Sequence, residues 1–295
     1  MPPRPNSALA PALALLLAAC EAEPQAAADT AAPAAATAAE RPALGLMTSL
    51  PLYWPEGADV AALAQGDAPL PWQRRAIEAR YAITPLDTLS PIAGLTPDAP
   101  ETDPLKGLAR LAVIQPRGLS PADNVALDNW VNAGGRLLMV LDPALTGEYE
   151  APIGDPRRPV EAALIPPVVG RWGIEVGFGV HETEEAYYGS DTLPGGAVVP
   201  LAYPGHITLS PYAERRCVQH GAASVTCRVG KGQVTLIADA ALFEHSELAG
   251  EGGAGLGAVI AAAFETPAGE NAGSGGLGVA PNPENRGKTR VVTGF

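Results

Sequence analysis

Two almost wholly apolar segments, separated by one helix-like segment, place the strongest constraint on how this chain can fold. Leu108–Gln115 and Arg136–Leu141 contain few polar residues. Strands that read as continuous apolar runs are typical of parallel sheets, because both faces of such strands are covered. Strand-like and helix-like segments also alternate along the rest of the middle of the chain. The sequence therefore predicts an α/β domain with a doubly wound, mostly parallel sheet and an antiparallel hairpin near the C-terminus.

The segment between the two apolar runs carries the signals of one complete helix. Ser120 is a residue type that caps the amino end of a helix, and Pro121 suits the first helical position. Asp123 stands where a capping box has its acidic partner. Gly134 follows the apolar stripe, and glycine commonly ends a helix. We expect this helix to pack against the sheet.

The first twenty residues read as an export signal and not as part of a domain. Residues 8–17 are apolar, but a membrane-spanning helix needs about 20 such residues. Cys20 follows Ala18 and Ala19, a pattern that resembles the lipobox of bacterial lipoproteins. That resemblance implies cleavage before Cys20, lipidation of its sulfur and attachment to a membrane on its periplasmic side. Glu21 is not the aspartate of inner-membrane retention, which favours the outer membrane. An ordinary secretory signal with an incidental cysteine is the alternative.

The other two of the three cysteines are spaced symmetrically. Cys217 and Cys227 each lie five residues from Ala222, so a hairpin that turns at residues 221–223 would place them opposite each other. Residues directly opposite in an antiparallel pair are within disulfide range. An exported protein meets an oxidising compartment. The spacing predicts a disulfide, with two unpaired core thiols as the alternative.

Composition divides the chain into four parts. Residues 1–19 are the signal peptide, and residues 20–43 are an Ala- and Pro-rich stretch predicted to be a disordered tether. Residues 44–267 are the α/β domain, and residues 268–295, rich in Gly, Asn and Pro, are predicted to be a disordered tail. The net charge of −13 and the isoelectric point near 4.7 exclude nucleic acid as an expected partner.

Two stretches resemble the accessory domain of gliding-motility-type ABC transport systems. One is Leu119–Pro143, the helix and the strand after it, and the other is Val229–Phe243, with a Gly-Lys-Gly turn and an apolar strand. The usual Gly-Asp-Ser after that strand is Ala-Asp-Ala in this chain, so Asp239 is kept. The chain is also similar to uncharacterised lipoproteins of alphaproteobacteria. The resemblance implies a fold like that of class I glutamine amidotransferases, or flavodoxin-like, without their catalytic residues.

The residues agree with the absence of an amidotransferase site. Such an enzyme needs a cysteine at a strand end, activated by a histidine. The strand ends carry Gln115, Asp142 and Asp239, while Cys217 and His220 lie in the predicted hairpin. The four histidines are scattered, so no metal site is expected. We predict no catalytic residue, metal or cofactor.

Ligands of open α/β sheets bind beyond the carboxyl ends of the strands. The residues expected at that edge are Tyr53, Trp54, Gln115, Arg117, Asp142 and Asp239. Acidic and amide groups beside aromatic rings could hold a polar small molecule. The alternative is that the two aspartates cap backbone amides and that the tryptophan packs a loop.

One charged loop is a candidate for binding a protein partner. Asp155, Arg157 and Arg158 lie close together, and arginines form forked hydrogen bonds with carboxylates. These residues could bind an envelope protein, or they could form ion pairs that pin the loop itself.

Together, these features predict a non-enzymatic, membrane-anchored accessory protein in the periplasm. It would serve as an auxiliary subunit of an ABC transporter, bound to a small molecule, a transporter subunit or an envelope protein. A hydrolase or an amidotransferase-like enzyme that uses the strand-end carboxylates is the alternative. A structural envelope protein is a third interpretation.

Overall fold

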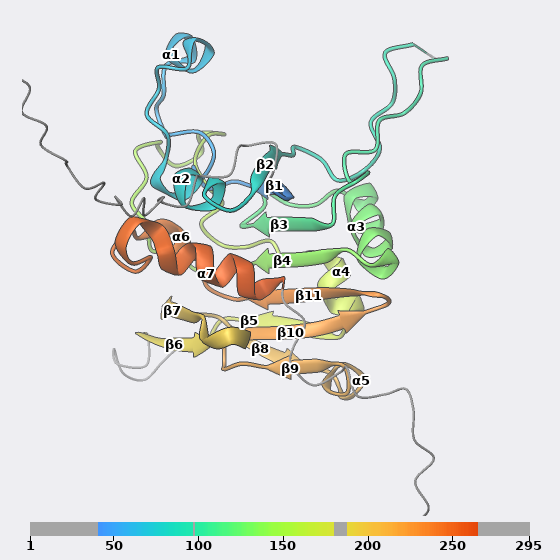
Figure 1. Ribbon diagram of the computed structural model, residues 1–295. Coiled ribbons are helices and arrows are strands. Elements are labelled where there is room, and N and C mark those ends of the chain that lie inside the picture. The colour runs from blue at the N-terminus through green and yellow to red at the C-terminus, as the bar shows by residue number, and fades with distance from the viewer. Residues whose placement is uncertain (1–40, 97, 180–187, 265–295) are drawn as a thin grey trace, which may run out of the picture. The chain divides into compact units, whose positions relative to one another are not determined.

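A seven-stranded mixed sheet forms the centre of the computed structural model, which describes residues 41–96, 98–179 and 188–264. Its strand order is β2-β1-β3-β4-β11-β10-β9, visible from top to bottom in Figure 1. The strands are β1 (Ala43–Thr48), β2 (Ala82–Pro85), β3 (Arg110–Ile114), β4 (Arg136–Val140), β9 (Cys217–Gln219), β10 (Ser224–Val229) and β11 (Gly232–Ile237).

The four central strands are apolar and buried, as strands covered on both faces must be. Strands β1, β3, β4 and β11 pair in parallel, and Leu111, Leu137 and Val234 lie in register across three of them. All three side chains are fully buried. Helices α2 (Trp72–Glu78) and α7 (Ala254–Ala263) lie in front of the sheet in Figure 1.

The predicted fold class is wrong. The sheet is not a doubly wound, mostly parallel one of the amidotransferase-like or flavodoxin-like kind, but a mixed sheet of seven strands. The predicted antiparallel hairpin with the two cysteines is present as β9 and β10. Two further two-stranded antiparallel sheets lie outside it. They pair β5 (Ile174–Gly177) with β8 (His206–Leu209), and β6 (Tyr188–Thr192) with β7 (Val198–Ala202). The physical reason is that β5 to β10 form antiparallel pairs, which need no crossover helix, whereas β11 returns to pair in parallel with β4.

The remaining helices are short, apart from α3 (Pro121–Ala133). They are α1 (Val60–Gln65), α4 (Pro167–Arg171), α5 (Pro211–Glu214) and α6 (Ala241–Glu244). None of the helices within the described ranges is long and apolar enough to span a membrane. Cys20, most of the predicted tether and the predicted tail lie outside the described residues.

Helix α3 begins with the predicted capping box. The Oγ of Ser120 accepts a hydrogen bond from the backbone N–H of Asp123 at 3.0 Å, and the carboxylate of Asp123 accepts one from the N–H of Ser120 at 3.1 Å. The same carboxylate also accepts the N–H groups of Leu89 and Ser90 and the hydroxyl of Thr88. Burial alone would raise the pKa of Asp123, but these hydrogen bonds outweigh it and hold the pKa below its usual range. The cap therefore also fastens the preceding loop.

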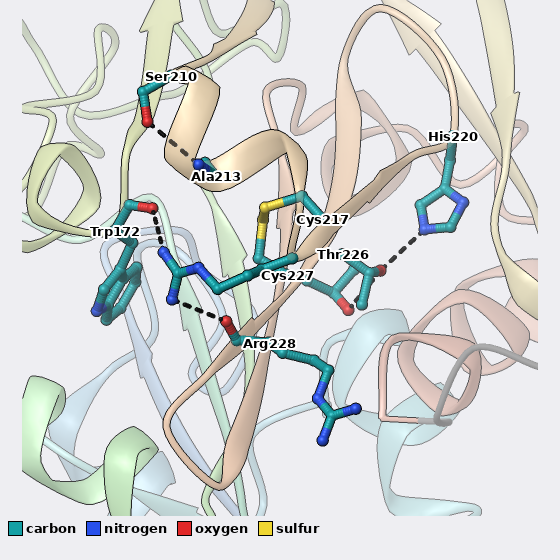
Figure 2. Close-up of a disulfide and its surroundings, with 10 residues drawn as sticks. Trp172, Ser210, Ala213, Cys217, His220, Thr226, Cys227 and Arg228 are labelled. Carbon is teal, nitrogen blue, oxygen red and sulfur yellow. Dashed lines mark hydrogen bonds between the residues drawn. A yellow bond between two sulfur atoms is a disulfide. The ribbon is translucent and has the colours of Figure 1, made fainter. Parts of the chain in front are cut away.

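The predicted disulfide is present at the edge of the sheet. Cys217 of β9 and Cys227 of β10 lie directly opposite each other, with their Cα atoms 4.0 Å apart. Figure 2 shows this bond beside two other attachments of the same edge. Arg216 donates hydrogen bonds to the carbonyls of Trp172 and Arg228, both at 3.3 Å. The disulfide and this arginine therefore join the edge strand to the rest of the domain.

We expect the double substitution Cys217→Ser and Cys227→Ser to lower the free energy of unfolding by about 2–3 kcal/mol, because the disulfide restricts a short loop of the unfolded chain. Urea unfolding with and without a reductant measures this difference. Reductant should leave the double variant unchanged. Equal unfolding midpoints for the oxidised and reduced wild-type protein would contradict the prediction.

Candidate functional site

The carboxyl edge of the sheet is held by a buried polar side chain, Gln115, directly after β3. Its Nε2 donates to the carbonyls of Asp142 and Val160 at 2.9 and 2.8 Å, and its Oε1 accepts the N–H of Asp142 at 2.8 Å. Its own carbonyl accepts two hydrogen bonds from Ser49. Gln115 is fully buried and has a positive φ of 43°. The side chain and the backbone carbonyl of Gln115 therefore together join the ends of β1, β3 and β4.

The carboxylates of the two strand-end aspartates also form hydrogen bonds with backbone N–H groups. Asp142 accepts the N–H groups of Ala144 and Ala240, each at 2.8 Å. Asp239 accepts those of Ala202 and Ala241, at 2.7 and 2.8 Å. The exposed fractions of the two aspartates are 0% and 1%. Each carboxylate thus satisfies two buried N–H groups, and neither can reach a ligand.

Burial also shifts the titration of these two carboxyl groups. Burial raises the pKa of Asp142 to about 6, against the two hydrogen bonds that favour its charged form. Burial, together with the nearby charge of Asp142, raises the pKa of Asp239 to about 8. The prediction that Gln115, Asp142 and Asp239 bind a ligand is therefore corrected, because all three hold the ends of the strands.

The predicted aromatic pair, in contrast, does line a cavity. We call it the aromatic cavity: about 550 Å³ beside the carboxyl ends of β1 and β2, between the loops 49–58 and 150–159. Tyr53 and Trp54 meet edge to face, with ring centroids 4.8 Å apart. The guanidinium of Arg74 lies 4.0 Å from the centre of the Tyr53 ring. Arg117, predicted for the same edge, is exposed and lines neither this cavity nor the one described below.

The charged loop predicted to bind a partner forms internal ion pairs. Arg157 makes a forked contact with Asp155, at 3.0 Å from Nε and 2.7 Å from Nη2. These hydrogen bonds lower the pKa of Asp155 to about 2. Arg158 pairs with Glu161 and donates to the carbonyls of Tyr149 and Ala151. These contacts agree with the alternative in which internal ion pairs pin the loop. Binding of a protein partner through this loop stays a prediction.

A second cavity of about 450 Å³ adjoins the first and shares Leu50, Pro51 and Glu56 with it. We call it the threonine cavity, because Thr146 and His245 line it. The Oγ1 of Thr146 lies 2.9 Å from the Nε2 of His245. The Nδ1 of His245 lies 3.5 Å from a carboxylate oxygen of Glu247. The hydroxyl of Thr146, the imidazole of His245 and the carboxylate of Glu247 therefore lie in a row in space.

Glu244, the last residue of α6, holds the threonine loop in place. Its carboxylate accepts the N–H groups of Thr146 and Gly147, at 3.1 and 2.9 Å, and the hydroxyl of Tyr149. It also lies 3.3 Å from the hydroxyl of Thr146, as an acceptor. Burial, and after it the contact with Glu244, raises the pKa of Tyr149. The phenol therefore stays protonated and donates to the carboxylate.

The sequence-based reasoning did not select Thr146, Glu244 or His245. A positional signal existed, because Thr146 follows Asp142 by four residues and His245 follows Asp239 by six. Both positions lie just beyond the strand ends, where ligands of α/β sheets bind. Among the described residues, no group of three or more His, Cys, Asp or Glu residues could hold a metal ion.

Comparisons with known proteins give distant structural likenesses. No family model matches the chain, and no curated protein resembles it in sequence. Among solved structures, it is similar to an exo-β-1,4-mannosidase from Opitutaceae bacterium strain TAV5, with 15% identity and a TM-score of 0.40 over 77% of this chain and 36% of the other. It is also similar to a β-galactosidase from Rahnella sp. R3, with 13% identity and a TM-score of 0.36 over 68% and 29% of the two chains. The chain thus spans about a third of the length of these enzymes.

Both of these proteins are glycoside hydrolases, and neither is a transport accessory protein. The prediction of a non-enzymatic accessory subunit is contradicted by them and is not carried further. At these TM-scores the likenesses supply no argument about the activity of this chain. The resemblance to the transport accessory domain stays a sequence-based prediction.

We expect the free energy of unfolding to fall as the pH rises from about 4 to about 8. Between the ordinary carboxyl pKa of 3.8 and the raised values of Asp142 and Asp239, the folded protein binds more protons than the unfolded chain. Urea unfolding at several pH values in this range measures the trend.

Asp239→Asn should make the free energy of unfolding decrease less steeply with rising pH, because it removes the group with the higher pKa. It should also lower stability at every pH, since an amide cannot accept both N–H groups. Asp67→Asn, at an exposed position, is the control and should keep the wild-type slope. Stability that rises over this pH range would contradict the prediction.

Proposed function

We propose that this protein is a hydrolase of carboxylic esters and that Thr146 is its nucleophile. The observation that carries the proposal is the 2.9 Å contact between the hydroxyl of Thr146 and the Nε2 of His245 in the threonine cavity. A hydroxyl is a weak nucleophile unless an adjacent base removes its proton. The contact is within the range expected for such a pair.

The reaction would use the two groups in turn. His245, in the tautomer with its proton on Nδ1, takes the proton of Thr146 as Oγ1 attacks the ester carbonyl carbon. His245 then gives that proton to the leaving alcohol, which leaves an acyl group on Thr146. Water, with its proton taken by His245, then attacks this acyl group. His245 returns the proton to Oγ1 of Thr146 as the acyl–oxygen bond breaks, which releases the carboxylic acid and restores the hydroxyl of Thr146.

Two acidic residues would support the pair without touching the substrate. Glu247 lies 3.5 Å from Nδ1 of His245, so it favours the required tautomer and the imidazolium form during the reaction. Glu244 binds the backbone N–H groups of Thr146 and Gly147, which fixes the position of the nucleophile. The two residues are positioning residues in this proposal.

The place of the cavity in the fold supports the same proposal. Thr146 follows β4 and His245 follows β11, two strands that pair in parallel. Their loops therefore leave the sheet at the same edge, where ligands of α/β sheets bind. His245 is 28% exposed, so solvent and substrate can reach it.

Thr146→Val keeps the size of the side chain and removes the hydroxyl. With 4-nitrophenyl acetate as the substrate, we expect kcat/KM to fall by about 10³-fold or more, as for the loss of a nucleophile. Thr146→Ser should stay within roughly tenfold of the wild-type value, because it keeps the nucleophile. His245→Gln should cost about 10²–10⁴-fold.

His206→Gln, at an exposed histidine on β8, is the control and should leave the rate unchanged. A fluorophosphonate probe should label the peptide that contains Thr146 in the wild-type protein and not in Thr146→Val. Wild-type rates in the valine variant, or labelling at another residue only, would disprove the assignment.

We propose further that the chain is anchored to a membrane through lipid on Cys20 and faces the periplasm. The disulfide between Cys217 and Cys227 supports an oxidising compartment. Stable anchoring takes more than one acyl chain, as the lipobox pattern implies.

Cys20→Ala should move the protein from the membrane fraction to the soluble fraction of lysed cells. The variant without the disulfide, with serine at positions 217 and 227, is the control and should remain in the membrane fraction. Unchanged membrane attachment of Cys20→Ala would contradict the anchor.

A further inference from the structure

The aromatic cavity presents a flat apolar surface at its mouth. The indole of Trp54 is 51% exposed and lines the cavity. Its edge-to-face contact with Tyr53 fixes its orientation. Arg74 pairs with Glu78 at 2.8 Å, and its guanidinium lies over Tyr53 and, at 5.5 Å from the ring centre, also over Trp54. The indole is therefore held rigidly, with part of its surface available to a ligand.

Acidic side chains surround this surface. Glu56, Asp87 and Glu150 line the cavity. The carboxylate of Glu56 accepts the N–H of Ala151 at 2.9 Å, which ties the loop 49–58 to the loop that carries Glu150. Gly57, the residue after Glu56, has a φ of +68°. The carboxylate of Glu150 lies beside it, only 3.5 Å from where a Cβ on this residue would be. The two glutamates are thus brought close to each other from different loops.

The cavity also contains a hydrogen-bond donor, Arg157. Its guanidinium is 76% exposed in the forked pair with Asp155, so the pair holds it at the cavity rim. The cavity therefore combines an apolar plane, three carboxylates that accept hydrogen bonds and one guanidinium that donates them.

These groups select against most classes of small molecule. An anion would meet three carboxylates and only one arginine, which is already paired. A purely apolar ligand would take the carboxylates out of water without giving them a partner, which is unfavourable. A cation would find the Tyr53 ring already covered by Arg74 and Arg157 at the rim. A neutral ring with hydroxyl groups avoids each of these costs.

We propose that the aromatic cavity is a saccharide subsite, and that the substrate of the hydrolase is an acyl ester carried on a sugar. The C–H face of a sugar ring would pack on Trp54, and neighbouring hydroxyl groups would donate to Glu56 and Glu150. The size of the cavity, about 550 Å³, lies in the range of small-molecule sites.

The residues shared by the two cavities indicate where the ester group of the substrate would lie. Leu50, Pro51 and Glu56 line both of them, and in this proposal a substituent on a ring in the aromatic cavity would pass these residues to reach Thr146. The products would be the sugar with a free hydroxyl and the carboxylic acid. This second half of the inference rests on the proposed hydrolase activity, whereas the binding of the sugar does not.

Calorimetric titration of the wild-type protein with N-acetylglucosamine, mannose, galactose and their β-1,4-linked dimers tests the subsite without turnover. We expect at least one of these probes to bind saturably, with Kd in the millimolar range or tighter. Trp54→Ala should weaken that binding by roughly tenfold or more. Phe178→Ala is the matched control, because Phe178 is 50% exposed and lies outside both cavities.

A second pair of variants tests the acidic rim. Glu150→Gln should weaken binding of the same probe, whereas Glu175→Gln, at an exposed position of β5, should not. Hydrolysis of the acetylated form of the probe, compared with 4-nitrophenyl acetate, then tests the ester. The acetylated sugar should have the higher kcat/KM, and Trp54→Ala should remove that preference mainly through KM.

The outcomes separate the two proposals. If 4-nitrophenyl acetate is cleaved through Thr146 but none of the sugars binds, the hydrolase stands and the saccharide subsite is overturned. If a sugar binds through Trp54 but no ester is cleaved, the subsite stands and the ester is overturned with the hydrolase. Equal losses of binding in Trp54→Ala and Phe178→Ala would also overturn the subsite.

Discussion

A small group of buried hydrogen bonds at the carboxyl edge of the sheet holds the rest of the structure in place. Gln115, Asp142 and Asp239 follow three neighbouring strands and bind backbone groups of the loops that leave them. A buried N–H without a partner is costly, so each loop must start where one of these side chains can reach it. Burial disfavours the charged form of both carboxyl groups, which is why both of their pKa values are raised, and the charge of Asp142 adds to the effect at Asp239.

Both cavities depend on this arrangement. Because the strand-end side chains are occupied by the backbone, the groups left to act on a ligand lie a few residues further along each loop. Thr146 stands beyond Asp142, and His245 stands beyond Asp239. Glu244 then joins these two loops directly. The proposed site is thus a second layer of residues, built on a first layer that is structural.

Features set by neighbouring residues could be predicted well. The capping box at Ser120 and the pairing of Cys217 with Cys227 are both present, because each depends on spacing within about a dozen residues. The fold class was wrong, since residues 174–209 contain short strands whose pairing partners no local signal specifies. At the site, Tyr53 and Trp54 were placed on a cavity, whereas the aspartates have a structural role.

The sequence by itself determined that apolar strands alternate with a capped helix, that two cysteines are spaced for a disulfide and that acidic groups gather after the strands. Only the tertiary structure decided which of those acidic groups face a cavity. Thr146 and His245 are 99 residues apart in the chain, and they meet because β4 and β11 pair in parallel. That pairing follows from how the apolar strands pack into one sheet, which is a long-range outcome. The positions of Thr146 and His245 just beyond two strand ends indicate a shared site only once that pairing is known.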